Sequence, residues 1–271
     1  MSCGQVFWIC GGVMTQFRFG KHPPKNDFRT LRFKKYLKSN IAAPPKAENK
    51  LNQVYKKLNI NDPTTLFPMD GNDTYGDCTI AALAHAETVF RGLVGNELIM
   101  PSPAVVKLYL QLTGGVDSGM NELDVLNYWQ SNRVSGDELI AFAKIDPKNH
   151  TEVQQALHLF GGVYLGFQVQ KNCQQEFQSH KPWTPGPLTN DGHAVFAVAY
   201  DQNGVTVLTW GNTQNGTWGW WDECVDEAYA LLPPETQKPG FAPGFDFAQL
   251  KADLAAVAQP STKPLETWKI K

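Results

Sequence analysis

The chain has 271 residues, of which 42% are hydrophobic and 18% charged, a composition typical of a globular protein and not of a disordered one. No apolar run reaches the roughly 18 residues that a membrane-spanning helix needs, so we expect no membrane segment. The net charge of −2 hides an asymmetry, because residues 14–57 carry 12 basic and two acidic residues, whereas residues 58–271 carry 12 basic and 24 acidic ones. The sequence predicts a basic arm of net charge +10 joined to an acidic body of net charge −12.

Residues 1–13 are apolar and lack Lys and Arg, which does not fit a secretory signal peptide. We interpret them as a non-native or flexible start, with Met14 as the natural first residue. Residues 14–60 contain two Pro-Pro pairs and predict an extended arm with one helix over Glu48–Leu58. Two roles stay open for the arm. In the first, the arm packs on the acidic body of its own chain, and one form of this hypothesis has it cover a functional cleft. In the second, the arm binds a polyanion. We favour the first role and expect no nucleic-acid partner.

The body is expected over residues 61–260, and its first half, about 61–160, is helical. Periodic apolar positions, and Ser102 as an N-cap before Pro103, define these segments. The four predicted helices are Thr79–Leu93, Ser102–Leu112, Asn121–Asn132 and Thr151–Phe160.

The pattern changes at Gly161, and residues 161–232 are expected to form an antiparallel strand half. The predicted strands are Val163–Val169, His193–Tyr200, Val205–Trp210 and a short one at Trp218–Trp221. Helices are predicted over Asp222–Leu232 and over about residues 246–257, and residues 261–271 form a tail. Helices followed by antiparallel strands indicate the α+β class, not alternating βαβ units.

Cys78 carries the sharpest chemical signal. The chain has five widely spaced cysteines, an odd number without a C-x-x-C pair, so we expect neither a disulfide framework nor a metal site. Cys78 opens a predicted helix, where free N–H groups and the helix dipole favour a thiolate and can also face an oxyanion. Asp77 opposes the thiolate if it lies close by.

His193 is the candidate base for such a thiol. The run Asn190–Gly192 predicts a turn that would place His193 at the mouth of a strand, facing a cleft. The Gly- and Trp-rich run over Thr209–Trp220 follows the next hairpin and contains amide side chains that could steady an imidazole.

The order of these parts resembles the papain-like cysteine peptidase fold over about residues 66–232. The resemblance implies that Cys78 is the nucleophile, 115 residues before His193 as the base. It also implies that Asn72, six residues before the Cys, helps to form the oxyanion hole, with Asn where Gln is usual. The run Gly71–Thr79 is also similar to an uncharacterised bacterial papain-like group, which implies no particular substrate.

The sequence departs from the family pattern at the third catalytic position. Leu208-Thr209-Trp210-Gly211 stands where Asn-Ser-Trp-Gly is usual, so the expected Asn is missing. Asn212 is the first choice for the residue that orients His193, and Gln214 and Thr209 are the alternatives.

The sequence therefore predicts a papain-like thiol hydrolase that cleaves a peptide, isopeptide or amide bond in a peptide or protein substrate and needs no cofactor. The alternative is a catalytically inactive binding module on the same fold, motivated by the missing Asn and by Asp77. A catalytic thiol without a convincing signal peptide favours a cytoplasmic location.

Overall fold

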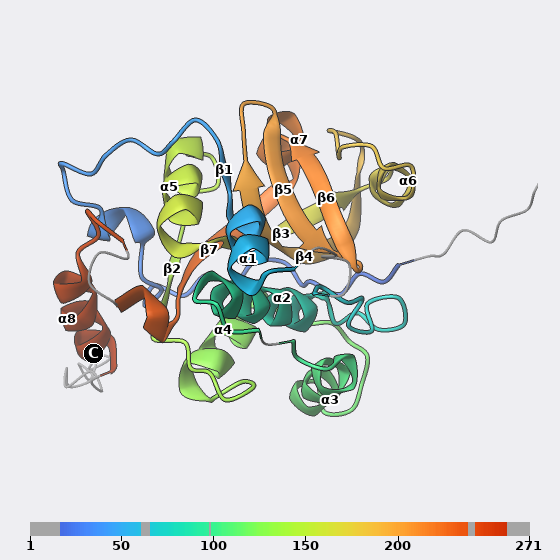
Figure 1. Cartoon of the computed structure of the whole chain (residues 1–271). Coiled ribbons are helices and arrows are strands. Elements are labelled where there is room, and N and C mark those ends of the chain that lie inside the picture. Colours follow the sequence, from blue (N-terminus) through green and yellow to red (C-terminus); the bar gives the residue numbers. More distant parts are fainter. Residues whose placement is uncertain (1–16, 61–65, 98, 238–241, 259–271) are drawn as a thin grey trace, which may run out of the picture.

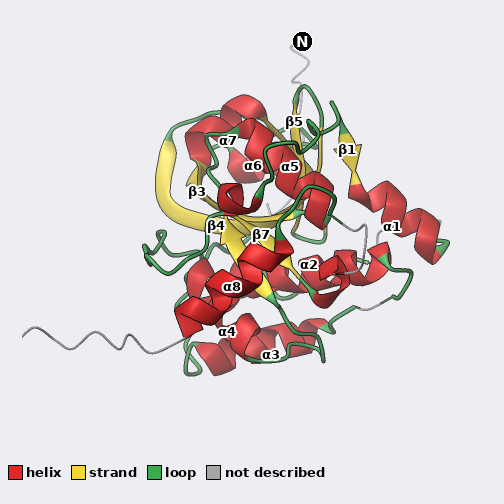
Figure 2. Ribbon diagram, turned by 90° about the vertical axis from the view of Figure 1, so that its left-hand side faces the viewer, coloured by secondary structure: helices red, strands yellow, loops and turns green. Residues whose placement is uncertain are grey.

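The computed structural model describes residues 17–60, 66–97, 99–237 and 242–258. The expected start over residues 1–13 and the tail over 261–271 lie outside these described residues. The fold is α+β, with helices on both faces of one antiparallel sheet (Figures 1 and 2). No helix in the described part of the chain is both long and apolar enough to cross a membrane.

The sheet has the strand order β2-β7-β3-β4-β5-β6, with the short β1 paired beside β4. Its strands are β1 (Glu48–Asn49), β2 (Ala141–Lys144), β3 (Val163–Gln170), β4 (Leu188–Tyr200), β5 (Gly204–Thr209), β6 (Asn212–Thr217) and β7 (Val225–Leu232). The last strand in sequence lies between β2 and β3, so the sheet joins the middle of the chain to its end.

The helices form two groups, one on each face. They are α1 (Lys50–Leu58), α2 (Cys78–Leu93), α3 (Ser102–Leu112), α4 (Glu122–Ser131), α5 (His150–Phe160), α6 (Cys173–Gln178), α7 (Trp218–Cys224) and α8 (Phe247–Ala258), with 3-10 turns at Phe33–Tyr36 and Pro234–Gln237. Helices α1, α2, α3 and α4 pack on one face of the sheet through one hydrophobic cluster. Helices α5, α6 and α7 pack on the other face through a second cluster. Figure 2 shows this division, with α2, α3 and α4 below the sheet and α5, α6 and α7 above it.

The helical half matches the prediction closely. Helices α2 to α5 and the arm helix α1 begin and end within two residues of the predicted positions. The Ala-rich α2 is buried along nearly all of its length against β4, and the Tyr164 hydroxyl of β3 donates to the Thr79 carbonyl at 2.8 Å. The prediction of Ser102 as N-cap is wrong, because Pro101 occupies that position and the Ser102 hydroxyl donates to Asp70 instead.

Three predictions in the strand half are wrong, and two of them concern residues 218–232. Trp218–Trp221 begins α7 instead of forming a strand, since the Thr217 hydroxyl caps the helix by accepting from the Trp220 N–H. The segment Asp222–Leu232 is not a helix, because from Val225 it forms β7. β7 contains helix formers such as Ala and Leu, but it pairs with strands on both sides, and this pairing overrides local propensity.

The turn predicted at Asn190–Gly192 is also wrong, because these residues belong to β4. Gly192 pairs with Gln168, and Leu188 pairs with Gln170 across an irregularity in β3. His193 consequently lies inside a strand of 13 residues and not at its mouth.

The arm follows the body in an extended path. It makes isolated bridges at three points, Lys21 with Met120, Arg32 with Lys144 and Leu37 with Phe245. Phe33 and Tyr36 are fully buried in the core beside Phe245, so the second part of the arm is held by packing.

Candidate active site

Cys78 is the first residue of α2 and is almost fully buried. The side chain of its N-cap, Asp77, makes no capping hydrogen bond. Burial raises the pKa of the Cys78 thiol to about 12, although hydrogen bonds from the backbone at Ala194 and Gly20 act to lower it. The thiol therefore lies beside the β4 residue that follows His193, and in this arrangement it is protonated at neutral pH.

Asp77 is buried next to the candidate nucleophile. Burial raises the pKa of its carboxyl to about 8, and the neighbouring carboxylate of Asp70 adds to this shift. The group is therefore mostly uncharged near pH 7, which reduces the opposition to a thiolate that the sequence suggested.

His193 is enclosed by aromatic rings. Its ring stacks on Trp210 with centroids 4.6 Å apart, and the edges of Phe19 and Phe167 lie 5.7 and 5.6 Å away. Burial lowers the pKa of the imidazole to about 3, so it is neutral here.

The hydroxyl of Thr209 is the hydrogen-bond partner of His193, with Oγ1 2.8 Å from Nε2. Nδ1 is buried and has no hydrogen-bond partner among the residues that the structure describes. Thr209 was an alternative to Asn212 in the sequence. It ends β5 one residue before Trp210, so the hairpin supplies both the hydroxyl and the stacked ring.

The two amide candidates for orienting His193 make other contacts. Asn212 is exposed at the start of β6, where its Oδ1 accepts from the Thr213 N–H at 2.8 Å. Gln214 donates through Nε2 to the carbonyl oxygens of Lys181 and Asn215. The imidazole of His193 is therefore bonded to the hydroxyl candidate and not to either amide.

Asn72 lies buried in the loop before α2. Its side-chain Nδ2 donates to the backbone carbonyl of Tyr75 at 3.2 Å and to that of Arg18 at 3.3 Å. The backbone carbonyl of Asn72 accepts from the Arg18 N–H at 2.9 Å. The amide that the family resemblance assigns to the oxyanion hole is therefore in contact with the arm.

Gly20 and Lys21 of the arm lie across the site in an extended conformation and make backbone hydrogen bonds on both sides. The Lys21 N–H donates to the Gly192 carbonyl at 3.0 Å, and the Met120 N–H donates to the Gly20 carbonyl at 2.8 Å. A Cβ on Gly20 would lie 1.8 Å from the Gly76 carbonyl oxygen, so only glycine fits there. The arm thus occupies the space between the Cys78 loop, Met120 and β4. The sequence did not predict this position of the arm, because no pattern around Gly20 marks it as a contact of Gly76.

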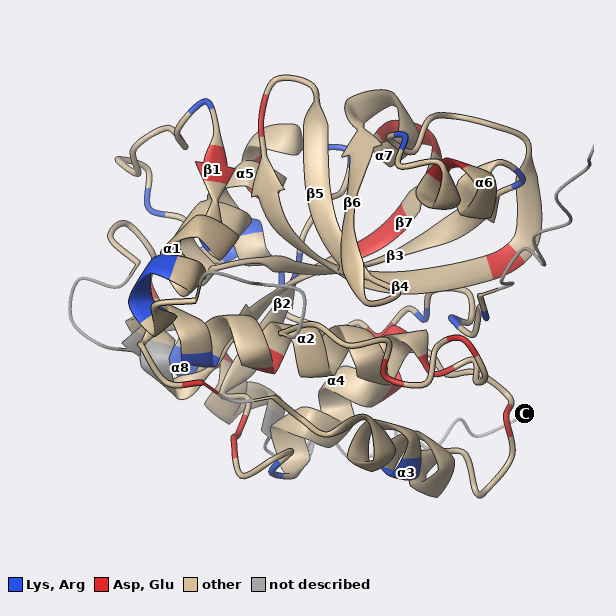
Figure 3. Ribbon diagram, turned by 45° about the vertical axis from the view of Figure 1, so that its right-hand side comes forward, with Lys and Arg blue, Asp and Glu red and all other residues tan. Residues whose placement is uncertain are grey.

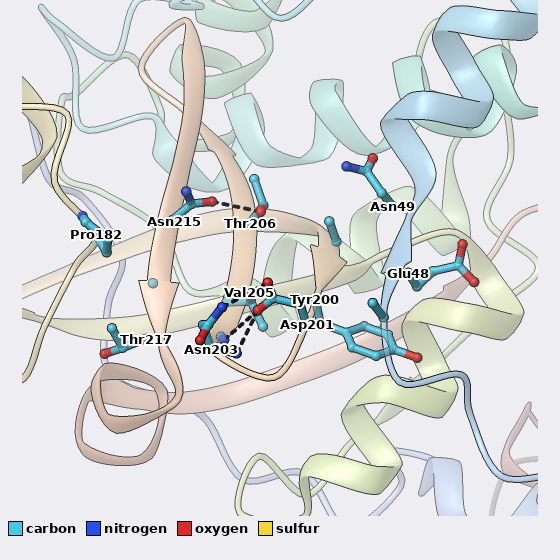
Figure 4. A pocket seen from close by; sticks show the side chains of 14 residues that line it. Glu48, Asn49, Pro182, Tyr200, Asp201, Asn203, Val205, Thr206, Asn215 and Thr217 are labelled. Carbon is cyan, nitrogen blue, oxygen red and sulfur yellow. Dashed lines mark hydrogen bonds between the residues drawn. The ribbon is translucent and has the colours of Figure 1, made fainter.

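An open hollow lies elsewhere on the molecule, beside the β4–β5 hairpin and β1 (Figure 4). It has a volume of about 650 Å³ and is lined by residues that include Glu48, Asp201 and Thr206, but not by Cys78 or His193. Among the described residues, no group of three or more His, Cys, Asp or Glu side chains is arranged to hold a metal ion.

Comparisons with known proteins agree with this architecture. No protein-family model and no curated protein matches the chain. Among solved structures it is similar to xylellain, a cysteine protease from Xylella fastidiosa, with 17% identity, a TM-score of 0.60 and coverage of 82% of this chain and 99% of that one. It is also similar to procathepsin B S9 from Trypanosoma congolense, with 12% identity, a TM-score of 0.55 and coverage of 79% and 86%.

A third similar structure contains the cysteine protease and lectin-like domains of Cwp84, a surface-layer-associated protein of Clostridium difficile. The identity is 13%, the TM-score is 0.52, and the match covers 82% of this chain and 57% of that one. At these identities the likeness establishes the fold, which is papain-like.

Proposed function

We propose that this protein is a cysteine peptidase with Cys78 as nucleophile and His193 as base. The observation that carries the proposal is the position of Cys78, at the head of α2 and beside the backbone of Ala194, the residue that follows His193. Two of the similar solved structures, xylellain and Cwp84, are described as cysteine proteases or as containing a cysteine protease domain, which supports the proposal.

In the proposed reaction, Cys78 Sγ attacks the carbonyl carbon of the scissile amide while its proton passes to His193. The Cys78 N–H and Asn72 Nδ2 stabilise the oxyanion of the tetrahedral intermediate. The intermediate collapses, the C–N bond breaks, and the leaving amine takes the proton from His193. Water, activated by His193, then hydrolyses the thioester and restores the thiol.

Thr209 is the proposed orienting residue. If Nδ1 of His193 is the basic atom, Nε2 carries a proton and donates it in a hydrogen bond to Thr209 Oγ1, which is 2.8 Å away. A hydroxyl would then do what an amide usually does in this fold, with Trp210 shielding the bond from water.

We further propose that the arm packs on its own body and holds the peptidase inactive. With residues 18–22 in place the thiol is buried and protonated, the imidazole is buried and neutral, and Asn72 is bonded to Arg18. Displacing this strand would hydrate both groups, which favours a thiolate beside an imidazolium.

The test uses the full chain with Gly20→Val, which cannot keep the close approach to Gly76, and follows hydrolysis of an unfolded protein substrate. Asn26→Val is the matched control, since Asn26 is an exposed arm residue. We expect hydrolysis to rise at least about tenfold with Gly20→Val, to stay at the wild-type level with Asn26→Val, and to vanish when Cys78→Ser is added. Circular dichroism verifies that each variant is folded.

The second candidate function is an inactive binding module on the same fold. The observation that favours it is Leu208, buried where the family resemblance expects an Asn. A folded Gly20→Val chain that hydrolyses no substrate, yet binds peptides equally well with and without the added Cys78→Ser substitution, would support this alternative and contradict the peptidase.

A further inference from the structure

The side chain of Lys21 enters an acidic pocket, formed by Glu122, Asp226 and Glu227, next to the candidate active site. Its Nζ lies 2.9 Å from Asp226 and 3.2 Å from Glu227, both on β7, and the side chain is only 1% exposed. It also donates to the carbonyl of His22 at 3.2 Å. Figure 3 shows the acidic stretch on β7 that contains these two residues.

Glu122, the first residue of α4, completes the pocket. It is fully buried, and both of its carboxyl oxygens are shielded from solvent. A Cβ on Gly166 would lie 1.8 Å from Lys21 Cε and 2.9 Å from Glu122 Oε1. Gly166 therefore leaves room for a long side chain to pass, and Glu122 lies beside that path.

The charges in the pocket favour a cation. Burial alone lowers the pKa of the Lys21 ammonium, but Glu122, Asp226 and Glu227 outweigh it and leave the pKa above its ordinary value. Burial raises the pKa of Glu122 and Glu227, and the Tyr229 hydroxyl donates to Glu227 at 2.8 Å. Without the Lys21 ammonium, the buried Glu122 and Glu227 would lose the favourable charge interaction that each has with it.

Two consecutive residues of the arm, Gly20 and Lys21, connect the thiol with the pocket. Gly20 contacts Gly76 and the Cys78 thiol, and Lys21 is the next residue, about 3.8 Å farther along the backbone. The arm is held there by backbone hydrogen bonds to Met120 and Gly192, which any extended peptide can make.

We propose that Glu122, Asp226 and Glu227 form a specificity pocket that takes a Lys or Arg side chain of the substrate, one residue away from the residue at Cys78, and that Lys21 occupies this pocket in place of the substrate. The inference rests on the proposed peptidase function and names its substrate class. An apolar side chain could not replace the ion pairs that Lys21 makes with Asp226 and Glu227, whereas a basic side chain restores them.

The first test maps the bonds that the full-length Gly20→Val chain cleaves in a peptide library generated with a Glu-specific protease. We expect Lys and Arg to be enriched about tenfold at one position within two residues of the cleaved bond. Glu227→Gln should remove most of this enrichment while cleavage continues.

Asp124→Asn is the matched control, because Asp124 lies on the same helix as Glu122 and pairs with Lys25 of the arm, but at the surface. It should leave the preference unchanged. Cleavage without enrichment of Lys or Arg, or enrichment that survives both Glu227→Gln and Glu122→Gln, overturns the inference and leaves the peptidase function standing.

A binding measurement decides the inference even without hydrolysis. A fluorescent peptide that copies residues 17–23 is titrated into the Gly20→Val/Cys78→Ser chain and compared with a peptide that has norleucine in place of Lys21. We expect at least about tenfold weaker binding of the norleucine peptide, since it has the same length but no charge. Equal affinities overturn the inference. A tenfold difference with no cleavage in the library supports the pocket and contradicts the peptidase.

Discussion

At the scale of single residues, the candidate site depends on three neighbours of the proposed Cys–His pair. Thr209 is bonded to the imidazole of His193, Trp210 covers that bond, and Asp77 lies buried beside Cys78. Each can be changed without removing a reacting group, so each tests positioning or electrostatics separately from the chemistry.

Thr209→Val keeps the shape of the side chain and removes the hydroxyl that contacts His193 Nε2. In the Gly20→Val background we expect kcat to fall about tenfold or more, because the imidazole loses its orienting partner, with little change in KM. Thr209→Ser should restore most of the rate. Equal kcat values for the Val and Ser variants would contradict a positioning role.

The raised pKa of the Asp77 carboxyl should make the stability of the protein depend on pH. Its folded pKa of about 8 lies above the unfolded value of 3.8, so its contribution to stability is fully present below pH 3.8 and is lost as pH rises through 8. The Tm of wild type should therefore fall relative to that of Asp77→Asn between about pH 5 and about pH 8.5. The exposed Asp73→Asn serves as control and should show a constant offset. A constant offset for Asp77→Asn as well would show that Asp77 titrates normally.

At the scale of elements, local pattern was sufficient where a helix has its own amphipathic face and end signals. Asn49 and Asn121 cap α1 and α4, and Gly161 ends α5 in a left-handed conformation. It was not sufficient for β7, whose Ala and Leu residues favour a helix until two strands pair with them. β6 was missed because its polar sequence, NTQNGT, has no apolar alternation.

The arm is also attached to the body by apolar packing around Phe33. Phe33 is fully buried against Phe160 and Phe245, whereas Phe28 is 99% exposed. Phe33→Ala should lower the free energy of unfolding by about 3–5 kcal/mol, as measured by urea denaturation. Phe28→Ala should change it by less than about 0.5 kcal/mol. Similar small effects for both would mean that the arm contributes no packing energy at this point.

At the scale of the whole molecule, the charge asymmetry corresponds to contacts between arm and body. Lys21 pairs with Asp226 and Glu227, Lys25 with Asp124, and Lys35 with Asp253 at 2.7 Å. The sequence predicted the α+β class and the papain-like arrangement, which the solved structures share. It could not predict that Gly20 and Lys21 lie over the site, because this depends on contacts between segments more than 50 residues apart.

The central claim is that Cys78 and His193 act as a pair in a site covered by the arm. The most direct test is the pH dependence of Cys78 alkylation by iodoacetamide in the Gly20→Val chain, followed by peptide mapping, with the buried Cys173 and Cys224 as internal controls. We predict that Cys78 reacts much faster than both, with an apparent pKa at least about one unit below the ordinary thiol value of roughly 8.5, and that His193→Gln abolishes this shift. An apparent pKa of roughly 8.5 or higher that is unchanged by His193→Gln would contradict the account.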